Sequence, residues 1–347
     1  MTVRRIFHIQ PGTDGGTERF MITLAKGFAD RGITQGFAIR PGRSWADEIT
    51  PLGAIEEGQF LRRTPGGLWS LWRLHRMIRA WRPDAIMAWR APAARLVPRM
   101  ASVAKIVRLG DHPRHARHFA GLDAVVCNNP TIVTHVAGLG WSGETPVISN
   151  FARPVAAQPI TRAELETPED AFVVCGAGRF TRGKGFDLLI DAVAQLPQAW
   201  LWLVGDGDEG EQLRAQVAAL GMARRVRFAG WRADPTAVIA AADAFVLPSR
   251  KEPLGNALIE AWQVGVASVA SRTDGPQWYA SDGDDCLLVP IDNADAIAQA
   301  LGRLMADPAL RARLVAGAHA TLAARFAPDA VIDAYIALFD RLKQAQT

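Results

Sequence analysis

Glu252 and Glu260 are the two acidic residues whose surroundings first suggest chemistry. An apolar run of buried-strand length, 244–247, precedes them. Pro253 and Gly255 then favour a helix start, because proline suits a first helical turn and glycine admits close backbone approach to a ligand. Glu260 therefore lies about one and a half turns into the helix, roughly 8 Å along its axis. Carboxylates this far apart do not form an acid/base pair, but they can hold two parts of one elongated ligand.

The start of that helix and a second loop offer complementary groups for a bound anion. Free backbone N–H groups at a helix N-terminus attract anions, and here they belong to Leu254, Gly255, Asn256 and Ala257. Arg179 and Lys184 lie in a glycine-rich segment between a strand-like run and a helical pattern. Two cations on such a helix-entry loop can neutralise a diphosphate, with each charged hydrogen bond contributing about 1.5–3 kcal/mol.

A glycine-rich turn also follows the first expected strand, 3–9. Gly15 and Gly16 stand in this turn, a helical pattern begins at Thr17, and Gly32 is a natural C-cap for that helix. A strand, a glycine-rich loop and a helix form the opening unit of a nucleotide-binding type of α/β domain, although the spacing here is not G-x-G-x-x-G.

Together these segments resemble the retaining glycosyltransferases of the GT-B fold, of the family 4 type (glycosyl transferases group 1). Glu252 to Ala261 resembles the family's E-x7-E motif, whose usual form is E-P-F-G-x-x-x-x-E-A, with Leu254 as a departure. Residues 178–192 resemble its G-R-x-x-x-x-K-G-x-D-x-L-I-x-A motif, and residues 15–18 resemble its G-G-x-E opening. The resemblance covers almost the whole chain, more strongly from 171 to 290 than from 3 to 150.

The resemblance implies transfer of a sugar from a nucleotide diphosphate sugar to a hydroxyl acceptor, with retention of the anomeric configuration. It implies that Arg179 and Lys184 stabilise the leaving diphosphate, that Glu252 holds the sugar, and that Glu260 holds the ribose hydroxyls. In this family the acceptor hydroxyl is thought to attack from the leaving-group side, so no protein nucleophile is expected. No cofactor and no bound metal are expected either.

Two further segments extend the donor site that the resemblance implies. The loop with Gly15 and Gly16 would lie near the donor phosphates and the acceptor. Val226 to Gly230 resembles V-x-F-x-G, whose backbone meets the nucleotide base in the family, so the following residue, Trp231, is a donor-binding candidate. The run from Gly205 to Gly210 is a literal G-x-G-x-x-G, but its acidic positions would repel a pyrophosphate, so we interpret it as structural.

Asp111 and His112 are the acceptor-side candidates, and they follow an expected strand at 105–109. Many family members carry a histidine after this strand, but the best match for that position here is Gly110. The alternative for this histidine-rich and arginine-rich segment is a solvated basic loop.

The chain of 347 residues is too long for one ordinary core, so two domains are expected. Strand-like runs alternate with helical patterns, which predicts an α/β fold with parallel sheets. Together with the resemblance, this predicts two Rossmann-like domains facing across a cleft (GT-B): residues 1–152 on the acceptor side, 153–328 binding the nucleotide sugar, and a helix at 329–347 packing back on the first. In the first domain, further strands are expected at 34–39, 84–88, 105–109, 123–127 and 146–149.

The helical segment 67–82 has two unlike faces. Leu71, Leu74, Ile78 and Trp81 form an apolar face, and Trp69, Trp72, Arg76 and Arg79 form the opposite one. Residues 1–154 hold 21 lysines and arginines against 11 acids, whereas the rest of the chain holds 18 against 24. Tryptophan and arginine suit a lipid headgroup boundary, so the outer face predicts peripheral binding to an anionic membrane. The alternative is packing against a neighbouring loop.

Several other assignments are unfavourable. Three cysteines without CxxC spacing are expected to be small buried residues in a reducing, cytoplasmic compartment. No stretch resembles a signal peptide or a membrane span, and the acidic run 282–285 is interpreted as a loop rather than a metal site.

We therefore expect a glycosyltransferase that uses a nucleotide sugar and a lipid-linked or cell-envelope glycan acceptor, of lipopolysaccharide or exopolysaccharide type, at the inner face of the plasma membrane. Two alternatives remain. A sugar-nucleotide epimerase of related fold would use the same phosphate loops, and a basic nucleic-acid-binding protein would explain the charge of the first half. The two sequence motifs around Lys184 and Glu252 favour the glycosyltransferase, with no nucleic acid as partner.

Overall fold

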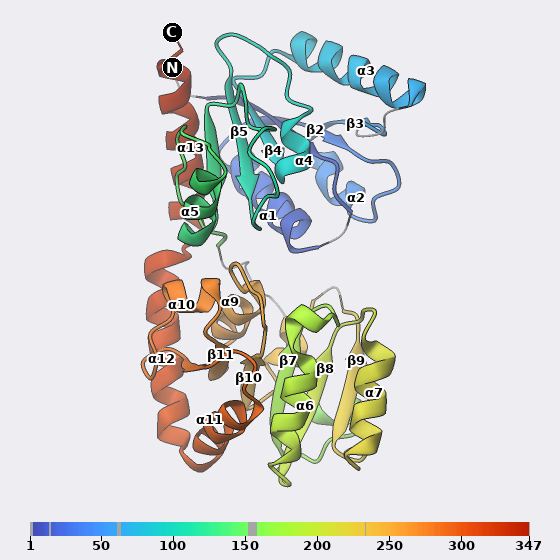
Figure 1. Cartoon of the computed structure of the whole chain (residues 1–347), viewed down its shortest axis with the longest axis vertical. Coiled ribbons are helices and arrows are strands. Elements are labelled where there is room, and N and C mark those ends of the chain that lie inside the picture. The colour runs from blue at the N-terminus through green and yellow to red at the C-terminus, as the bar shows by residue number, and fades with distance from the viewer. Residues whose placement is uncertain (1–2, 14, 61–63, 152–157, 233, 347) are drawn as a thin grey trace. The chain divides into compact units, whose positions relative to one another are not determined.

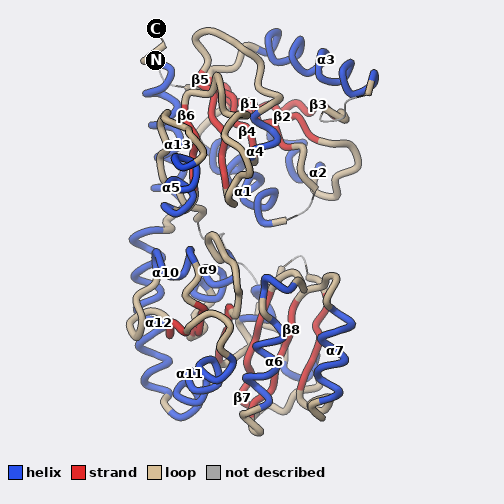
Figure 2. Tube along the Cα trace, in the orientation of Figure 1, coloured by secondary structure: helices blue, strands red, loops and turns tan. Residues whose placement is uncertain are grey.

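The computed structural model describes residues 3–13, 15–60, 64–151, 158–232 and 234–346. The chain forms two compact units, one of Met1–Phe151 with Pro328–Thr347 and the other of Ala152–Ala327. Each unit contains one six-stranded sheet with helices on both faces (Figures 1 and 2). Every pair of neighbouring strands is parallel.

The first unit has the strand order β3-β2-β1-β4-β5-β6, which is the doubly wound order of nucleotide-binding domains. Its strands are β1 (Arg5–Gln10), β2 (Thr34–Ile39), β3 (Gly53–Glu57), β4 (Ala85–Trp89), β5 (Ala104–Leu109) and β6 (Ala124–Cys127). Its helices are α1 (Gly16–Asp30), α2 (Ala46–Ile49), α3 (Pro65–Trp81), α4 (Ala91–Ala94), α5 (Pro130–Gly138) and α13 (Pro328–Gln344), with a 3-10 turn η1 (Thr50–Leu52).

The second unit repeats that topology with the order β12-β11-β10-β7-β8-β9. Its strands are β7 (Phe172–Ala177), β8 (Ala199–Val204), β9 (Val226–Gly230), β10 (Ala244–Leu247), β11 (Ser268–Ser271) and β12 (Leu287–Val289). Its helices are α6 (Phe186–Ala194), α7 (Gly210–Ala219), α8 (Thr236–Ile239), α9 (Asn256–Gln263), α10 (Asp274–Tyr279), α11 (Ala294–Ala306) and α12 (Pro308–Arg325), with 3-10 turns η2 (Arg162–Leu165) and η3 (Arg182–Lys184).

Both sheets are buried on two faces, and this explains their sequence pattern. Successive strand residues point to opposite faces, so Ile6 of β1 packs into the core that contains α1 and α13, whereas Phe7 packs into the core that contains α3 and α5. In the second unit, α6, α7 and α11 cover one face of the sheet, α8 and α9 cover the other, and α12 contributes buried residues to both cores. Figure 1 shows α6 and α7 side by side along their face. The predicted α/β class with two Rossmann-like sheets is confirmed.

Two details of the first sheet differ from the sequence expectation. Residues 146–149 are not a strand, because this segment meets β6 only through an isolated bridge between Cys127 and Val147. β3 was not predicted at all. It is an edge strand of the sequence GAIEE, and its residues are only partly buried, so it lacks the apolar run that marks the central strands.

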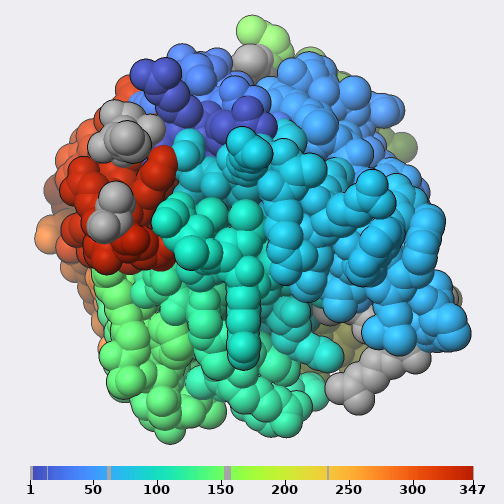
Figure 3. Space-filling model, turned by 90° about the horizontal axis from the view of Figure 1, so that it is seen from above, coloured from blue at the N-terminus to red at the C-terminus, as the bar shows by residue number. Residues whose placement is uncertain are grey.

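Helix α13 belongs to the first unit, where polar contacts fix both of its ends. Arg31 donates to Asp329 at 2.8 Å and to Asp333 at 2.9 Å. Arg341 makes two hydrogen bonds to Glu144, at 2.6 and 2.8 Å. The end of the chain therefore lies beside its start, as the red and dark-blue atoms of Figure 3 show.

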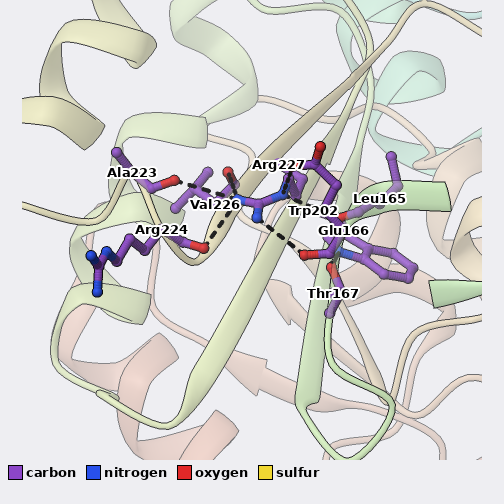
Figure 4. Close-up of polar contacts among 8 residues, drawn as sticks. All are labelled: Leu165, Glu166, Thr167, Trp202, Ala223, Arg224, Val226 and Arg227. Carbon is purple, nitrogen blue, oxygen red and sulfur yellow. Dashed lines mark hydrogen bonds and ion pairs between the residues drawn. The ribbon is translucent and has the colours of Figure 1, made fainter. Parts of the chain in front are cut away.

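The segment that enters the second unit is held by side chains of β8 and β9. Arg227 donates to the carbonyl oxygens of Leu165 and Glu166, each at 3.1 Å, and Trp202 Nε1 donates to Thr167 Oγ1 at 3.0 Å (Figure 4). The segment 165–167 is thus fastened to the second sheet.

Helix α3 has the two faces that the sequence predicts. Leu74 and Ile78 are fully buried, whereas Trp69 and Trp72 are 57% and 56% exposed. The guanidinium of Arg76 lies 5.5 Å from the ring centre of Trp72, and that of Arg73 lies 4.8 Å from Trp69. Within the described residues, no helix has both the length and the apolar character that crossing a membrane requires.

Candidate functional site

The candidate donor site lies where the second sheet reverses its strand order. Strands β7 and β10 are neighbours there, and the loops that leave their carboxyl ends run to opposite faces of the sheet. Such a switch point is where open α/β sheets bind ligands. The loop after β7 carries Arg179 and Lys184, and the loop after β10 carries Glu252. The topology therefore brings two separate sequence motifs together.

Lys184 and Glu252 are in direct contact. Lys184 Nζ donates to Glu252 Oε2 at 2.5 Å, and the buried Ser249 donates to the same oxygen at 3.3 Å. Glu252 is only 8% exposed, whereas 32% of the Lys184 side chain is accessible. Arg179 begins the same loop and is exposed. An incoming diphosphate would thus find Lys184 and Arg179 accessible and Glu252 beneath them.

Arg250 fastens these two loops to each other, a role that the sequence did not reveal. Its guanidinium donates to both carboxylate oxygens of Asp187 at 2.7 Å and to the Arg182 carbonyl at 2.8 Å. Its backbone N–H donates to the Gly183 carbonyl at 2.9 Å. Hydrogen bonding to Asp187 raises the pKa of Arg250, despite partial burial. Arg250 therefore helps to fix the position of Lys184 relative to Glu252.

Two glycines permit the close approach of the loops. Gly185 has φ 68°, and a Cβ there would lie 2.1 Å from the carbonyl oxygen of Pro248. Gly255 precedes α9 with φ 89°, and a Cβ there would lie 3.0 Å from Leu247 and 3.2 Å from the Tyr279 hydroxyl. Positive φ and lack of space both favour glycine at these positions.

The remaining donor candidates lie on α9 and after β9. Leu254 is buried, so only its backbone can meet a ligand. Asn256, Ala257 and Glu260 are half-buried along α9. Trp231 is 69% exposed and follows β9, which β7 and β8 separate from β10. The α9 residues thus belong to the same loop–helix segment as Glu252, whereas Trp231 follows the edge strand β9.

The G-x-G-x-x-G run packs as expected of a structural turn. A Cβ on Gly205 would lie 1.9 Å from the Gly178 carbonyl oxygen, and one on Gly207 would lie 2.5 Å from that of Phe180. Beside it is a cavity of about 410 Å³. Its lining comprises Phe180, Gly205, Asp206, Gly207, Asp208, Gly210, Glu211, Arg214 and Gly230. With three carboxylates against one guanidinium, this cavity does not suit a phosphate.

In the first unit, the loop with Gly15 and Gly16 also lies at a switch point, between β1 and β4. Glu18, in the first turn of α1, is 3% exposed, and a Cβ on Gly12 would lie 2.0 Å from its Oε1 atom. The Gly12 N–H donates to Gln10 Oε1 at 2.9 Å. The glycine-rich turn is therefore packed tightly onto a buried carboxylate.

Asp111 and His112 follow β5; 69% of the Asp111 side chain is exposed, and its Oδ1 atom accepts from the His112 N–H at 2.8 Å. The His112 ring is half-buried and stacks edge-on against His135 of α5, with centroids 4.9 Å apart. Its Nε2 atom lies 3.5 Å from Thr131 Oγ1. The structure thus supports a packing role for His112 and exposure for Asp111.

Arg108 occupies the space that a side chain at position 110 would need. This arginine of β5 is 1% exposed, contacts Asn150, and lies over the Phe20 ring at 5.0 Å. A Cβ on Gly110 would lie 2.4 Å from its NH1 atom. Burial lowers the pKa of Arg108, and neighbouring Tyr335 and Glu18 oppose that shift. A buried arginine within an apolar strand gave no sequence signal of this role.

Comparison with known proteins agrees with this architecture. A model of the family "Glycosyl transferases group 1" matches residues 157–321. The chain is 44% identical to the lipopolysaccharide core biosynthesis glycosyltransferase LpsD of Rhizobium meliloti (strain 1021), over 97% of this chain and 98% of that protein.

Two solved structures share the fold. Sucrose-phosphate synthase from Thermosynechococcus elongatus has a TM-score of 0.83 at 23% identity, over 99% of this chain and 100% of that one. Anabaena HepE in complex with UDP and glucose has a TM-score of 0.82 at 22% identity, over 97% of this chain and 100% of that one.

The two doubly wound sheets and these matches define the class of protein, a glycosyltransferase of the GT-B fold. The chain belongs to the glycosyl transferases group 1 family, because the model of that family matches it and it shares 44% identity over nearly its whole length with the glycosyltransferase LpsD. This membership favours glycosyl transfer over the two alternatives, an epimerase and a nucleic-acid-binding protein.

Proposed function

We propose that this glycosyltransferase moves a sugar from a nucleotide diphosphate sugar to a hydroxyl group of a lipopolysaccharide core glycan, with retention of the anomeric configuration and without a bound metal. The observation that carries the donor half is the contact between Lys184 and Glu252 at the switch point of the second sheet. The acceptor half is supported by the relative from Rhizobium meliloti, whose name gives lipopolysaccharide core biosynthesis. The complex of Anabaena HepE with UDP and glucose supports a nucleotide-sugar donor.

In this proposal the diphosphate replaces Glu252 as the partner of Lys184. Lys184 and Arg179 then stabilise the negative charge that develops on the leaving diphosphate, together with backbone N–H groups at the start of α9. Glu252, released from Lys184, accepts hydrogen bonds from the sugar hydroxyls. Glu260, one turn further along α9, accepts from the ribose hydroxyls. These two cations stabilise the charge of the leaving diphosphate, a role that a bound metal ion has in other transferases.

Within the first unit, the Gly15–Gly16 loop and Asp111 form the acceptor side, because both lie at the carboxyl edge of the first sheet. On the second sheet, the backbone of Gly230 and Trp231 contacts the nucleotide base.

The outer face of α3 is the surface that we propose binds the membrane. Two exposed tryptophans lie beside arginines there, and residues 1–154 carry the excess of cations. Each arginine near an anionic bilayer contributes on the order of 1 kcal/mol, decreasing with salt. Such reversible binding at the inner face of the plasma membrane would bring the enzyme to a lipid-linked acceptor.

The test begins with a thermal-shift panel of UDP-, GDP- and ADP-sugars, because a ligand that binds only the folded state raises its stability. The stabilising donor is then incubated with truncated lipopolysaccharide core acceptors, with and without EDTA. We expect product to form in the presence of EDTA. The NMR signal of its anomeric proton, recorded from the first turnovers, should show that the anomeric carbon keeps the configuration of the donor. An inverted product, or activity that EDTA abolishes, contradicts the proposed mechanism.

A further inference from the structure

Arg90, the residue after β4, has an unusual backbone conformation. Its φ and ψ are 71° and 154°, in a region that is essentially reserved for glycine. Its N–H donates to the Arg108 carbonyl at 2.9 Å, which holds it in line with β5. Arginine costs free energy here that glycine would avoid. The backbone therefore does not require arginine at this position, and the side chain must account for it.

The position of Arg90 suggests what the side chain does. β4 lies beside β1 at the point where the first sheet reverses its strand order, so Arg90 shares this switch point with the Gly15–Gly16 loop. Ligands of open α/β sheets bind outside the carboxyl ends of the strands at such points. Arg90 is exposed there, and its side chain makes no hydrogen bond or ion pair with the part of the chain that the structure describes.

Further cations gather at the same edge. Arg95 follows the short helix α4, and the loop after β5 carries Arg114, Arg117 and His118. Arg117 Nε donates to His118 Nε2 at 3.4 Å. Burial lowers the pKa of His118, and the positive charges of Arg95 and Arg117 lower it further. Among the described residues, neither Arg95 nor Arg114 forms an ion pair. Two acids are described at this edge: Asp111 is exposed beside His112, and Glu18 is buried beneath the Gly15–Gly16 turn.

From this geometry we propose that Arg90 binds an anionic group of the acceptor sugar, a phosphate or a carboxylate, with Arg95, Arg114 and Arg117 raising the local positive potential. The inference rests on the proposed function, since it names the chemical class of acceptor. Arginine suits this task because its planar guanidinium can donate two parallel hydrogen bonds to either anion. Arg90 is then a specificity-determining residue, selecting charged over neutral acceptors.

Arg90→Gly tests the side chain alone, because it removes the guanidinium and also relieves the strained backbone conformation. Arg82→Gly is the matched control. Arg82 also has a positive φ of 53°, but it caps α3 and precedes the amino end of β4, away from the switch point. We expect both variants to unfold at the same temperature as the parent or higher, so that any loss of binding is not a loss of folding.

Binding is measured by NMR titration of the protein with glucose 6-phosphate, glucuronate and glucose. The parent should bind one or both anions at least fivefold more tightly than glucose. Arg90→Gly should lose this preference, and Arg82→Gly should keep it. Equal binding of anions and glucose by the parent, or an unchanged preference in Arg90→Gly, overturns the proposal. Comparison of the affinities for glucose 6-phosphate and glucuronate shows which anion is preferred.

Kinetics and vesicles complete the test. With a core oligosaccharide as acceptor, Arg90→Gly should raise the acceptor KM at least tenfold and leave the donor KM within twofold. Phosphatase treatment or carboxyl reduction of the acceptor should abolish the difference between parent and variant. If Arg90→Gly instead weakens only flotation with phosphatidylglycerol vesicles, the anion is a lipid headgroup and the acceptor proposal is wrong. Absence of any transfer by the parent overturns the proposed function, whereas the titration still decides the role of Arg90.

Discussion

Replacing Arg250 with alanine should destabilise the second unit and weaken donor binding together. The Arg250 side chain makes four hydrogen bonds, two to Asp187, one to the Arg182 carbonyl and one to Asp292, and only 18% of it is exposed. A fully exposed ion pair contributes about 0–1 kcal/mol, and loss of one partner of a buried pair costs about 3–5 kcal/mol. For this partly buried case we expect about 2–3 kcal/mol, or roughly 5–10 °C in unfolding temperature.

Calorimetric unfolding and nucleotide titration measure the two effects. Arg272→Ala is the control, because its ion pair with Asp282 has a similar N–O distance of 2.6 Å but both side chains are more than 40% exposed. Burial raises the pKa of Asp187, but hydrogen bonds from Arg250 outweigh this and hold it below 3.8. The stability from this pair is therefore present above pH 3.8 and lost as the pH falls below it. If Arg250→Ala is no less stable than Arg272→Ala at pH 7, the reasoning fails.

Three further predictions follow from the contacts described above. Glu260→Gln should mainly raise the donor KM. Glu252→Gln should mainly lower kcat, because Glu252 contacts Lys184. Unchanged kinetics with equal losses of stability would make both residues structural. The double variant Arg76→Glu, Arg79→Glu should no longer float with anionic vesicles at low salt, and it should keep its activity on a soluble acceptor. If the parent protein does not float with these vesicles, this face of α3 does not bind membranes. Burial lowers the pKa of His8 to about 4, although the hydrogen bond between its Nε2 atom and Gln35 Oε1 opposes this shift. Denaturant unfolding should therefore show stability falling by on the order of 3 kcal/mol between pH 6.5 and 4, and His8→Gln should flatten that decline.

The sequence predicted the main elements of the fold because most strands are buried on both faces. The run 124–127 is apolar throughout and 104–109 is apolar except for Lys105 and Arg108, and glycines mark the turns that follow the first strands of each sheet. Strand β3 was missed because an edge strand needs no apolar face. The segment 146–149 was assigned wrongly because its apolar residues pair with β6 at a single bridge.

For the candidate site, the motifs predicted which residues matter but not how they meet. Lys184 and Glu252 are far apart in the chain, and their contact depends on β7 and β10 being neighbours. Arg250 lies two residues before the motif that begins at Glu252, and its partner Asp187 lies in the other motif. Arg90 carries no sequence signal, because a positive φ at a non-glycine residue is visible only in the structure.

The central claim is that Lys184 and Glu252 form the site of the donor diphosphate. Calorimetric titration tests it most directly, with the nucleoside diphosphate that stabilises the parent best and with parent, Lys184→Ala and Arg272→Ala proteins. Loss of one charged hydrogen bond costs about 1.5–3 kcal/mol, so Lys184→Ala should bind roughly 10–150-fold more weakly while Arg272→Ala binds like the parent. A folded Lys184→Ala protein with the parental Kd would contradict the account.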